Sequence, residues 1–123
     1  MDAARLDAQN EITMRTPRRD GSWSSRPIWV VVVNGSAYVR SYLGMRGAWY
    51  RRVRVGRRAE ITVDGQTVAV GLEPVADEAL DRRISAAYRA KYGSRWPAPT
   101  EAMVGAEAAE TTMRLVPEHD AEA

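Results

Sequence analysis

Residues 28–42 read IWVVVVNGSAYVRSY: a short apolar run rich in β-branched residues, then Asn34-Gly35, then an alternating return stretch. Asn-Gly between two such stretches is the strongest short-range signal for a two-residue hairpin turn, because both turn positions need a positive φ. Six consecutive apolar residues predict a strand that is buried on both faces. We therefore predict an antiparallel hairpin with strands over residues 28–33 and 36–42.

A two-residue loop fixes the register of this hairpin, and directly opposed residues share one face of the sheet. Trp29 is then expected opposite Arg40, where the guanidinium would either pack on the indole or reach an anionic ligand. The face suited to a ligand or a partner subunit holds Trp29, Val31, Tyr38, Arg40 and Tyr42. The face expected to form the core holds Ile28, Val30, Val32, Ala37, Val39 and Ser41.

Turn residues and periodicity predict the other elements. Asp64-Gly65 predicts a second hairpin, in which Ile61 opposes Val68 on a core face and Thr62 opposes Thr67 on a polar face. One long helix is expected over residues 77–92, capped by Asp77 and ended by Gly93. A short helix is expected between the hairpins, and alternation predicts further strands. The helix is expected over residues 48–55, and the strands are expected over residues 11–16 and 111–116.

These elements describe one domain over residues 1–123, of mainly β (α+β) class, built as a small antiparallel barrel of six strands with appended helices. Residues 1–9 are expected to be a flexible lead-in with a frayed helical turn. Residues 94–108 are expected to be a connection with a helical turn around Met103. Residues 117–123 form an acidic tail.

The composition argues against several classes of protein. The chain has no cysteine, so it can form neither a disulfide nor a thiolate site. His119 is the single histidine and lies in the tail, so no catalytic triad or multi-histidine metal site is expected. No apolar run has the length of a membrane span, and the N-terminus lacks a signal-peptide pattern. We therefore expect a cytoplasmic protein, and the Arg, Ala, Val and Gly content without Phe suggests a bacterial one.

Arginine supplies almost all of the positive charge, since Lys91 is the only lysine. The net charge of +2 does not favour a general nucleic-acid binder. Two stretches concentrate the arginines, residues 15–26 and 46–58. Guanidinium groups suit bidentate capture of phosphate or carboxylate, so a small anionic ligand is one interpretation. Two solvated basic loops are the other.

Four short motifs then point to a family. They are Thr-Pro-Arg-Arg-Asp-Gly over residues 16–21, Arg-Pro-Ile-Trp over 26–29, Tyr-Val-Arg-Ser over 38–41, and Gly-Ala-Trp-Tyr-Arg-Arg over 47–52. The chain resembles the split-barrel superfamily of FMN-binding, pyridoxamine-phosphate-oxidase-like and deazaflavin-dependent nitroreductase proteins. It most resembles an uncharacterised domain-of-unknown-function branch, through Trp29, Arg40-Ser41, Trp49 and residues 87–93.

This resemblance implies a six-stranded split β-barrel that forms a homodimer, with FMN or a deazaflavin (coenzyme F-420) in a groove at the subunit interface. Carried over by position, Arg18 and Arg19 would face the phosphate, and Ser25 and Arg26 would lie on the strand leading in. The other residues of the implied coenzyme site are Trp29, Arg40, Ser41, Trp49 and Tyr50.

The implied activity is hydride transfer to a small substrate by an oxidoreductase. The chain itself offers no assigned catalytic residue, although Tyr38, Tyr42 or Tyr50 could donate a proton. A non-catalytic coenzyme-binding module is the alternative. A third reading, an interaction or weak nucleic-acid-binding barrel, rests on the arginines of residues 46–58.

Overall fold

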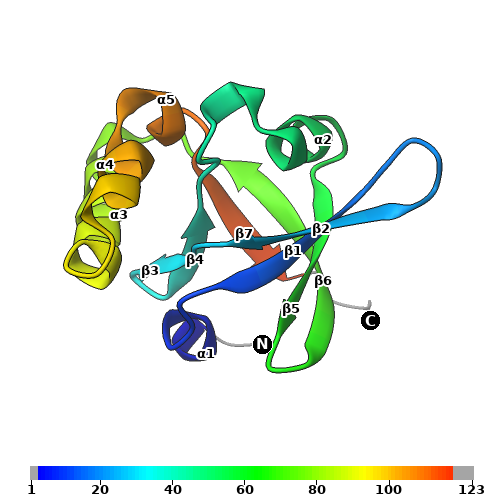
Figure 1. The fold of residues 1–123 in the computed structure, drawn as a ribbon, viewed down its shortest axis with the longest axis horizontal. Helices are drawn as coiled ribbons and strands as arrows, with labels where there is room; N and C mark the ends of the chain where they lie inside the picture. Colours follow the sequence, from blue (N-terminus) through cyan, green and yellow to red (C-terminus); the bar gives the residue numbers. More distant parts are fainter. Residues whose placement is uncertain (1–2, 118–123) are drawn as a thin grey trace.

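A single curled antiparallel sheet of seven strands organises the computed structural model, which describes residues 3–117 (Figure 1). The strands run in the order β2-β1-β5-β6-β7-β4-β3, so neighbours far apart in sequence close the half-barrel. Their bounds are β1 Ile12–Pro17, β2 Trp23–Ile28, β3 Val31–Val33, β4 Ser36–Val39, β5 Arg58–Val63, β6 Gln66–Pro74 and β7 Met113–Pro117. The α+β class is as expected, but the expected number of strands is one too low.

The additional strand is β2, which forms over residues 23–28, so that residues 28–33 do not form one strand. β2 ends at Ile28 and β3 begins at Val31, so Trp29 and Val30 lie between them. The Val30 N–H donates to Tyr92 Oη at 3.1 Å, and Lys91 Nζ donates to the Val30 carbonyl at 2.7 Å. Side chains of a distant helix therefore satisfy the backbone groups that a neighbouring strand would otherwise pair.

Both predicted hairpin turns form with the predicted register. Asn34 and Gly35 have φ values of 51° and 80°, and Asp64 and Gly65 have 52° and 79°, as a type I′ turn requires. Val31 lies opposite Tyr38 in the first hairpin, and Ile61 lies opposite Val68 in the second. The Thr62 and Thr67 hydroxyl oxygens meet across the second hairpin at 2.8 Å.

The predicted pair of Trp29 and Arg40 is wrong. β4 ends at Val39, and the ladder of the first hairpin begins at Val31 and Tyr38, so neither side chain has the other as a cross-strand neighbour. Trp29 stacks instead on Tyr92, with ring centroids 4.0 Å apart and planes 4° from parallel. Arg40 lies over the Tyr88 ring, with its guanidinium carbon 5.4 Å from the centroid.

The face that we assigned to a ligand or partner is mostly covered by the chain itself. Val31 and Tyr38 are buried against Ile84, Tyr88 and Tyr92 of the long helix α3. This helix, Glu78–Tyr92, begins at the predicted cap, where Asp77 Oδ1 accepts from the Leu80 N–H at 3.0 Å. The implied homodimer stays a prediction, and α3 of the same chain covers Val31 and Tyr38 on the face that a partner subunit was expected to bury.

The other helices lie around the sheet (Figure 1). They are α1 Ala3–Asp7, the 3₁₀ turn η1 Gly44–Arg46, α2 Ala48–Gly56, α4 Pro97–Val104 and α5 Ala106–Ala109. The expected lead-in thus holds a helix, whose Leu6 packs in the main core. The expected connection after α3 holds two short helices.

Two features of the sequence concern residues at the limit of the described chain. The acidic tail lies outside the described residues, apart from Pro117 at the end of β7, and His119 lies outside them as well.

Within residues 3–117, no helix is both long and apolar enough to cross a membrane. The same residues contain no group of three or more His, Asp or Glu side chains able to hold a metal ion.

The hydroxyl of Tyr92 provides a test of how α3 holds the strand break. Burial raises the pKa of Tyr92 to about 12, and its protonated Oη donates to the Asn10 carbonyl at 2.7 Å. Tyr92→Phe should lower the free energy of unfolding by about 1–3 kcal/mol, because it leaves the buried Val30 N–H unpaired and removes the bond to the Asn10 carbonyl. Urea denaturation followed by circular dichroism measures this change.

Tyr88→Phe is the matched control. Tyr88 is equally buried, but its hydroxyl has no hydrogen-bond partner among the described residues. Its removal should leave the unfolding free energy unchanged or slightly raised. Equal losses in the two variants would contradict a special role for the Tyr92 hydroxyl.

Candidate functional site

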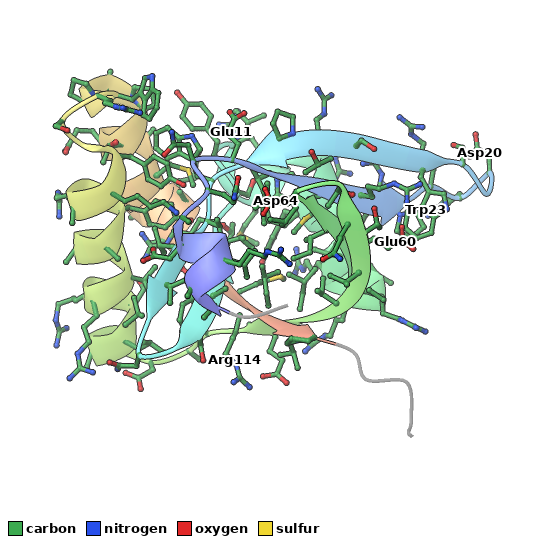
Figure 2. The ribbon with its side chains drawn as sticks, turned by 90° about the horizontal axis from the view of Figure 1, so that it is seen from below. Glu11, Asp20, Trp23, Glu60, Asp64 and Arg114 are labelled. Carbon is green, nitrogen blue, oxygen red and sulfur yellow. The ribbon has the colours of Figure 1, made fainter. Side chains whose placement is uncertain are left out.

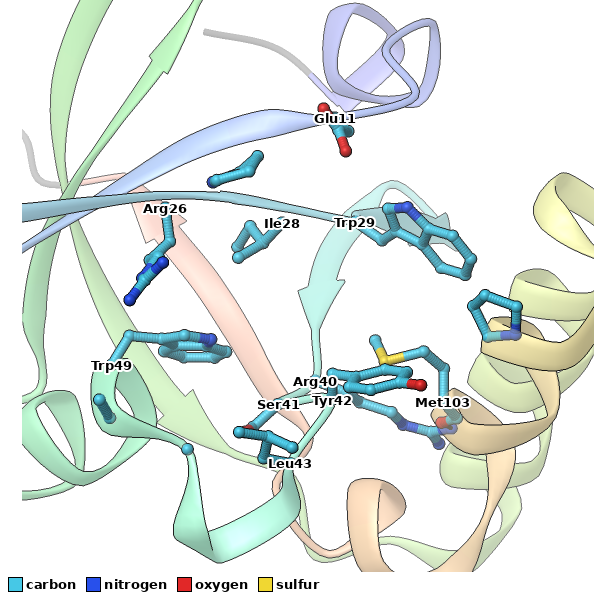
Figure 3. A pocket seen from close by; sticks show the side chains of 14 residues that line it. Glu11, Arg26, Ile28, Trp29, Arg40, Ser41, Tyr42, Leu43, Trp49 and Met103 are labelled. Carbon is cyan, nitrogen blue, oxygen red and sulfur yellow. Dashed lines mark hydrogen bonds between the residues drawn. The ribbon is translucent and has the colours of Figure 1, made fainter. Parts of the chain in front are cut away.

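A cleft of about 510 Å³ opens between the end of β2, the chain from residue 40 to the start of α2, and α4 (Figure 3). Its volume lies in the range of about 300–1,000 Å³ that small-molecule sites occupy. Glu11, Arg26, Ser41 and Tyr42 bring the polar groups. The apolar lining includes Ile28, Trp29, Leu43, Trp49 and Met103.

Ser41 and Gly47 meet on one wall of the cleft. The Ser41 residue is 1% exposed, and its hydroxyl has no hydrogen-bond partner among the described residues. A Cβ added at Gly47 would lie 2.2 Å from Ser41 Oγ, so this close approach requires glycine. A buried hydroxyl without a partner carries a desolvation cost, so this oxygen is suited to bind a polar group in the cleft.

The start of α2 lies beside this hydroxyl. Gly47 is the N-cap, no side chain caps the helix, and the Arg51 N–H donates to the Gly47 carbonyl at 3.0 Å. The N–H groups of Ala48, Trp49 and Tyr50 precede the first intrahelical bond, so the helix presents partial positive charge here. The Arg26 side chain reaches toward Trp49 at the same end of the cleft (Figure 3). This end therefore favours an anion.

Arg40 supports the cleft from behind. Its side chain has an exposed fraction of 0%. The guanidinium donates to Thr112 Oγ1 at 2.8 Å, to Ser85 Oγ at 2.9 Å and to the Met103 carbonyl at 3.0 Å. It also donates to the carbonyl and the carboxylate of Asp81, at 3.1 and 2.8 Å. All five donors are used within the protein, so Arg40 positions Ser41 and Met103 rather than offering a free contact to a ligand.

The other predicted site residues divide into three groups. Arg26, Trp29, Ser41 and Trp49 line the cleft together. Arg18 and Arg19 line a second hollow of about 790 Å³, which we call the arginine hollow. Its lining consists of Pro17, Arg18, Arg19, Ala48, Arg51, Arg52, Arg54, Val55 and Gly56. Ala48 lines both, so the cleft and the hollow adjoin at the first turn of α2.

Ser25 and Tyr50 line neither space. Ser25 is exposed on β2, where it pairs with Arg15 of β1. Tyr50 is buried in the main core beside Trp49, and the two rings are nearly perpendicular. Among the tyrosines considered as proton donors, Tyr42 lines the cleft and Tyr38 is buried against α3.

A family model described as "Uncharacterized protein conserved in bacteria (DUF2255)" matches residues 2–115. The chain belongs to this family. No curated protein sequence is similar enough to the DUF2255 chain to count as a match.

Three solved structures with the same fold carry different descriptions. An FAD-binding protein from Mesorhizobium loti has 18% identity and a TM-score of 0.59, covering 94% of this chain and 86% of that one. The heme storage protein HutZ from Vibrio cholerae has 13% identity and a TM-score of 0.67, with coverage of 94% and 87%. An F420-H2 dependent reductase has 12% identity and a TM-score of 0.62, with coverage of 87% and 94%.

These identities establish the fold alone. The DUF2255 chain has the split-barrel fold of the superfamily that the sequence motifs indicated, so that prediction is confirmed.

Sequence reasoning missed the parts of the cleft that tertiary structure assembles. Gly47 and Leu43 lie next to predicted residues, and the position of Gly47 directly before a predicted helix was a usable signal. Met103 and Pro99 come from α4, about sixty residues further along the chain, and Glu11 precedes β1. No local pattern connects these residues with Ser41 or Trp49.

Arg40→Met tests the positioning role. The variant removes the buried charge and the hydrogen bonds that it donates to Asp81, Thr112 and Ser85, so that Asp81 Oδ1 keeps only its bond from Thr112 Oγ1. The free energy of unfolding should fall by about 3 kcal/mol, near the lower end for breaking a buried ion pair, because Asp81 keeps contact with water. Thermal and urea denaturation measure the loss.

Arg114→Met is the matched control on β7. Arg114 pairs with Glu73 at the surface, where an ion pair contributes about 0–1 kcal/mol. A stable Arg40→Met variant would contradict the positioning role and return Arg40 to the ligand contacts.

Proposed function

We propose that this DUF2255 protein binds a phosphate-bearing flavin or deazaflavin coenzyme in the cleft. One observation carries the proposal: the buried, unpaired Ser41 hydroxyl lies against the uncapped start of α2, inside a cleft with aromatic walls. The descriptions of two proteins with this fold, one FAD-binding and one an F420-H2 dependent reductase, support the choice of ligand class.

The residues of the cleft fit such a molecule. A flavin ring system is flat and largely apolar at its edges, and Trp29, Trp49 and Met103 offer surfaces of that kind. A phosphate needs charge-assisted hydrogen bonds, which the first N–H groups of α2, Arg26 and Ser41 Oγ can donate. Glu11 lies on the opposite side of the cleft from these donors, so the charge is distributed unevenly along it (Figure 3).

The bound coenzyme would supply the hydride chemistry of an oxidoreductase. The chain's own residues would hold the ring, orient it and exclude water from one face. Tyr42 is 56% exposed at the cleft, and its phenol is the side chain best situated to give a proton to a substrate there. A module that binds the coenzyme without turnover uses the same cleft, so activity is a separate question from binding.

Ser41→Ala is the sharpest test of the binding mode. Because the hydroxyl makes no hydrogen bond within the described chain, its removal should leave the melting temperature unchanged or slightly raised. Affinity for FMN or coenzyme F-420 should fall by about tenfold, the scale of one lost charge-assisted hydrogen bond. Fluorescence titration with each coenzyme measures the affinity, and Ser94→Ala, at an exposed position after α3, is the control.

Three outcomes would contradict the proposal. They are saturable binding of hemin in place of both coenzymes, equal affinity of the Ser41→Ala and parent proteins, and no binding of either coenzyme. Where binding is found, oxidation of the reduced coenzyme in the presence of a nitroaromatic acceptor distinguishes an enzyme from a binding module.

A further inference from the structure

The arginine hollow lies between the β1–β2 hairpin and the exposed side of α2. Arg18 and Arg19 come from the hairpin turn, and Arg51, Arg52 and Arg54 come from the helix. No Asp or Glu belongs to the described residues that line it. Five positive charges therefore surround one concave space with no carboxylate among them.

The five arginines are held to different degrees. Arg18 donates to Ser22 Oγ at 3.2 Å and to the Trp23 carbonyl at 3.1 Å, and Arg52 donates to Thr16 Oγ1 at 3.3 Å. Arg19, Arg51 and Arg54 form no side-chain hydrogen bond or ion pair among residues 3–117. The hollow thus combines two guanidiniums held by neutral partners with three that keep all their donors for a ligand.

The neighbouring carboxylates are engaged elsewhere. Asp20 accepts hydrogen bonds from the Ser22 N–H at 2.9 Å and from the Ser22 hydroxyl at 2.6 Å, and these bonds lower the pKa of its carboxyl. Glu60 pairs with Arg15. Neither carboxylate lines the hollow, so none of the lining residues compensates its charge.

We propose that the arginine hollow is a subsite for the diphosphate tail of an extended coenzyme, in which the phosphate nearer the ring stays at the start of α2 and the outer phosphate reaches the arginines. The diphosphate of a dinucleotide coenzyme carries one negative charge on each phosphate, about the same total as the phosphate monoester of a mononucleotide. It presents more acceptor oxygens over a greater length, so it can reach guanidiniums that a single phosphate held at the start of α2 does not. The position of the coenzyme rests on the proposed function, whereas anion binding in the hollow does not.

The geometry connects the two spaces. Ala48 belongs to both linings, so a ligand that leaves the cleft over the first turn of α2 enters the hollow directly. Val55 lines the hollow with 87% of its surface exposed, which gives an apolar contact for a nucleoside beyond the diphosphate. A mononucleotide coenzyme would fill the cleft alone, and a dinucleotide would fill both.

Single-stranded nucleic acid fits this surface less well. Proteins that bind it combine a basic groove with aromatic side chains on which the bases stack. Within the described chain, no aromatic residue lines the hollow. The lining is also a local concavity at one helix, rather than a track along the protein.

The test compares a hollow variant with a charge-matched control. The hollow variant carries Arg51→Ala and Arg54→Ala, and the control carries Arg82→Ala and Arg83→Ala on the exposed side of α3. Each loses two positive charges. Calorimetric titrations of the parent and both variants use sodium pyrophosphate, FMN and FAD, and circular dichroism verifies that every variant is folded.

We expect the parent to bind FAD at least about tenfold more tightly than FMN, the scale of one charged contact. The hollow variant should lose this preference and its pyrophosphate binding while it binds FMN as the parent does, and the control should keep all three. If neither coenzyme bound, a loss of pyrophosphate binding in the hollow variant would still support the subsite. The absence of coenzyme binding would then reject the proposed function alone.

Three results would overturn the subsite. One is no binding of pyrophosphate together with equal affinities for FMN and FAD. Another is an FAD preference that the hollow variant retains. The third is tighter binding of a single-stranded oligonucleotide than of pyrophosphate, lost in the hollow variant, which would assign the surface to nucleic acid.

Discussion

The guanidinium of Arg40 connects four parts of the chain that the sequence separates. It follows β4, and its donors reach Asp81 and Ser85 on α3, the Met103 carbonyl on α4 and Thr112 before β7. A charge with no exposed surface is tolerated only when its donors are paired, so these elements must come together in one arrangement. Ser41 is the next residue and Met103 is itself a partner. The interaction that holds the helices to the sheet therefore also sets two walls of the cleft.

Local chemistry predicted the local elements well. The Asn34-Gly35 and Asp64-Gly65 turns need only a positive φ at adjacent positions, and the Asp77 cap needs one carboxylate near a helix start. The strand break at Val30 depends on Tyr92 and Lys91, about sixty residues away, and such partners leave no trace in the apolar run. For the same reason, the register of the Asn34-Gly35 turn assigned Val31 and Tyr38 to one face correctly but could not show that α3 covers that face.

The parts of the candidate site that come from short sequence motifs were predictable, and the parts that distant segments bring together were not. The motifs around Arg26, Trp29, Ser41 and Trp49 indicated residues that the fold brings to one cleft (Figure 3). The two arginines of the hairpin turn were expected beside the same ligand, yet they face Arg51 and Arg54 across a separate hollow. Figure 2 shows why, since the turn at Asp20 and Trp23 lies at the opposite end of the molecule from α3 and α4. The resemblance to the family predicts which residue types occupy these positions. The length and twist of the hairpin decide where their side chains point.

Helix α2 separates the two candidate subsites and is anchored in the core. Trp49 and Val53 anchor it in the main core, and Gly47 allows its first turn to touch Ser41. Its uncapped N–H groups belong to the cleft side, and Arg51 and Arg54 belong to the hollow side. The backbone N–H groups are therefore already arranged for a ligand, whereas the exposed side chains of Arg51 and Arg54 become ordered only when one binds. On this proposal, proteins with one fold can select coenzymes of different length without changing the ring site, because the residues on the exposed side of a single helix decide whether a longer tail is held.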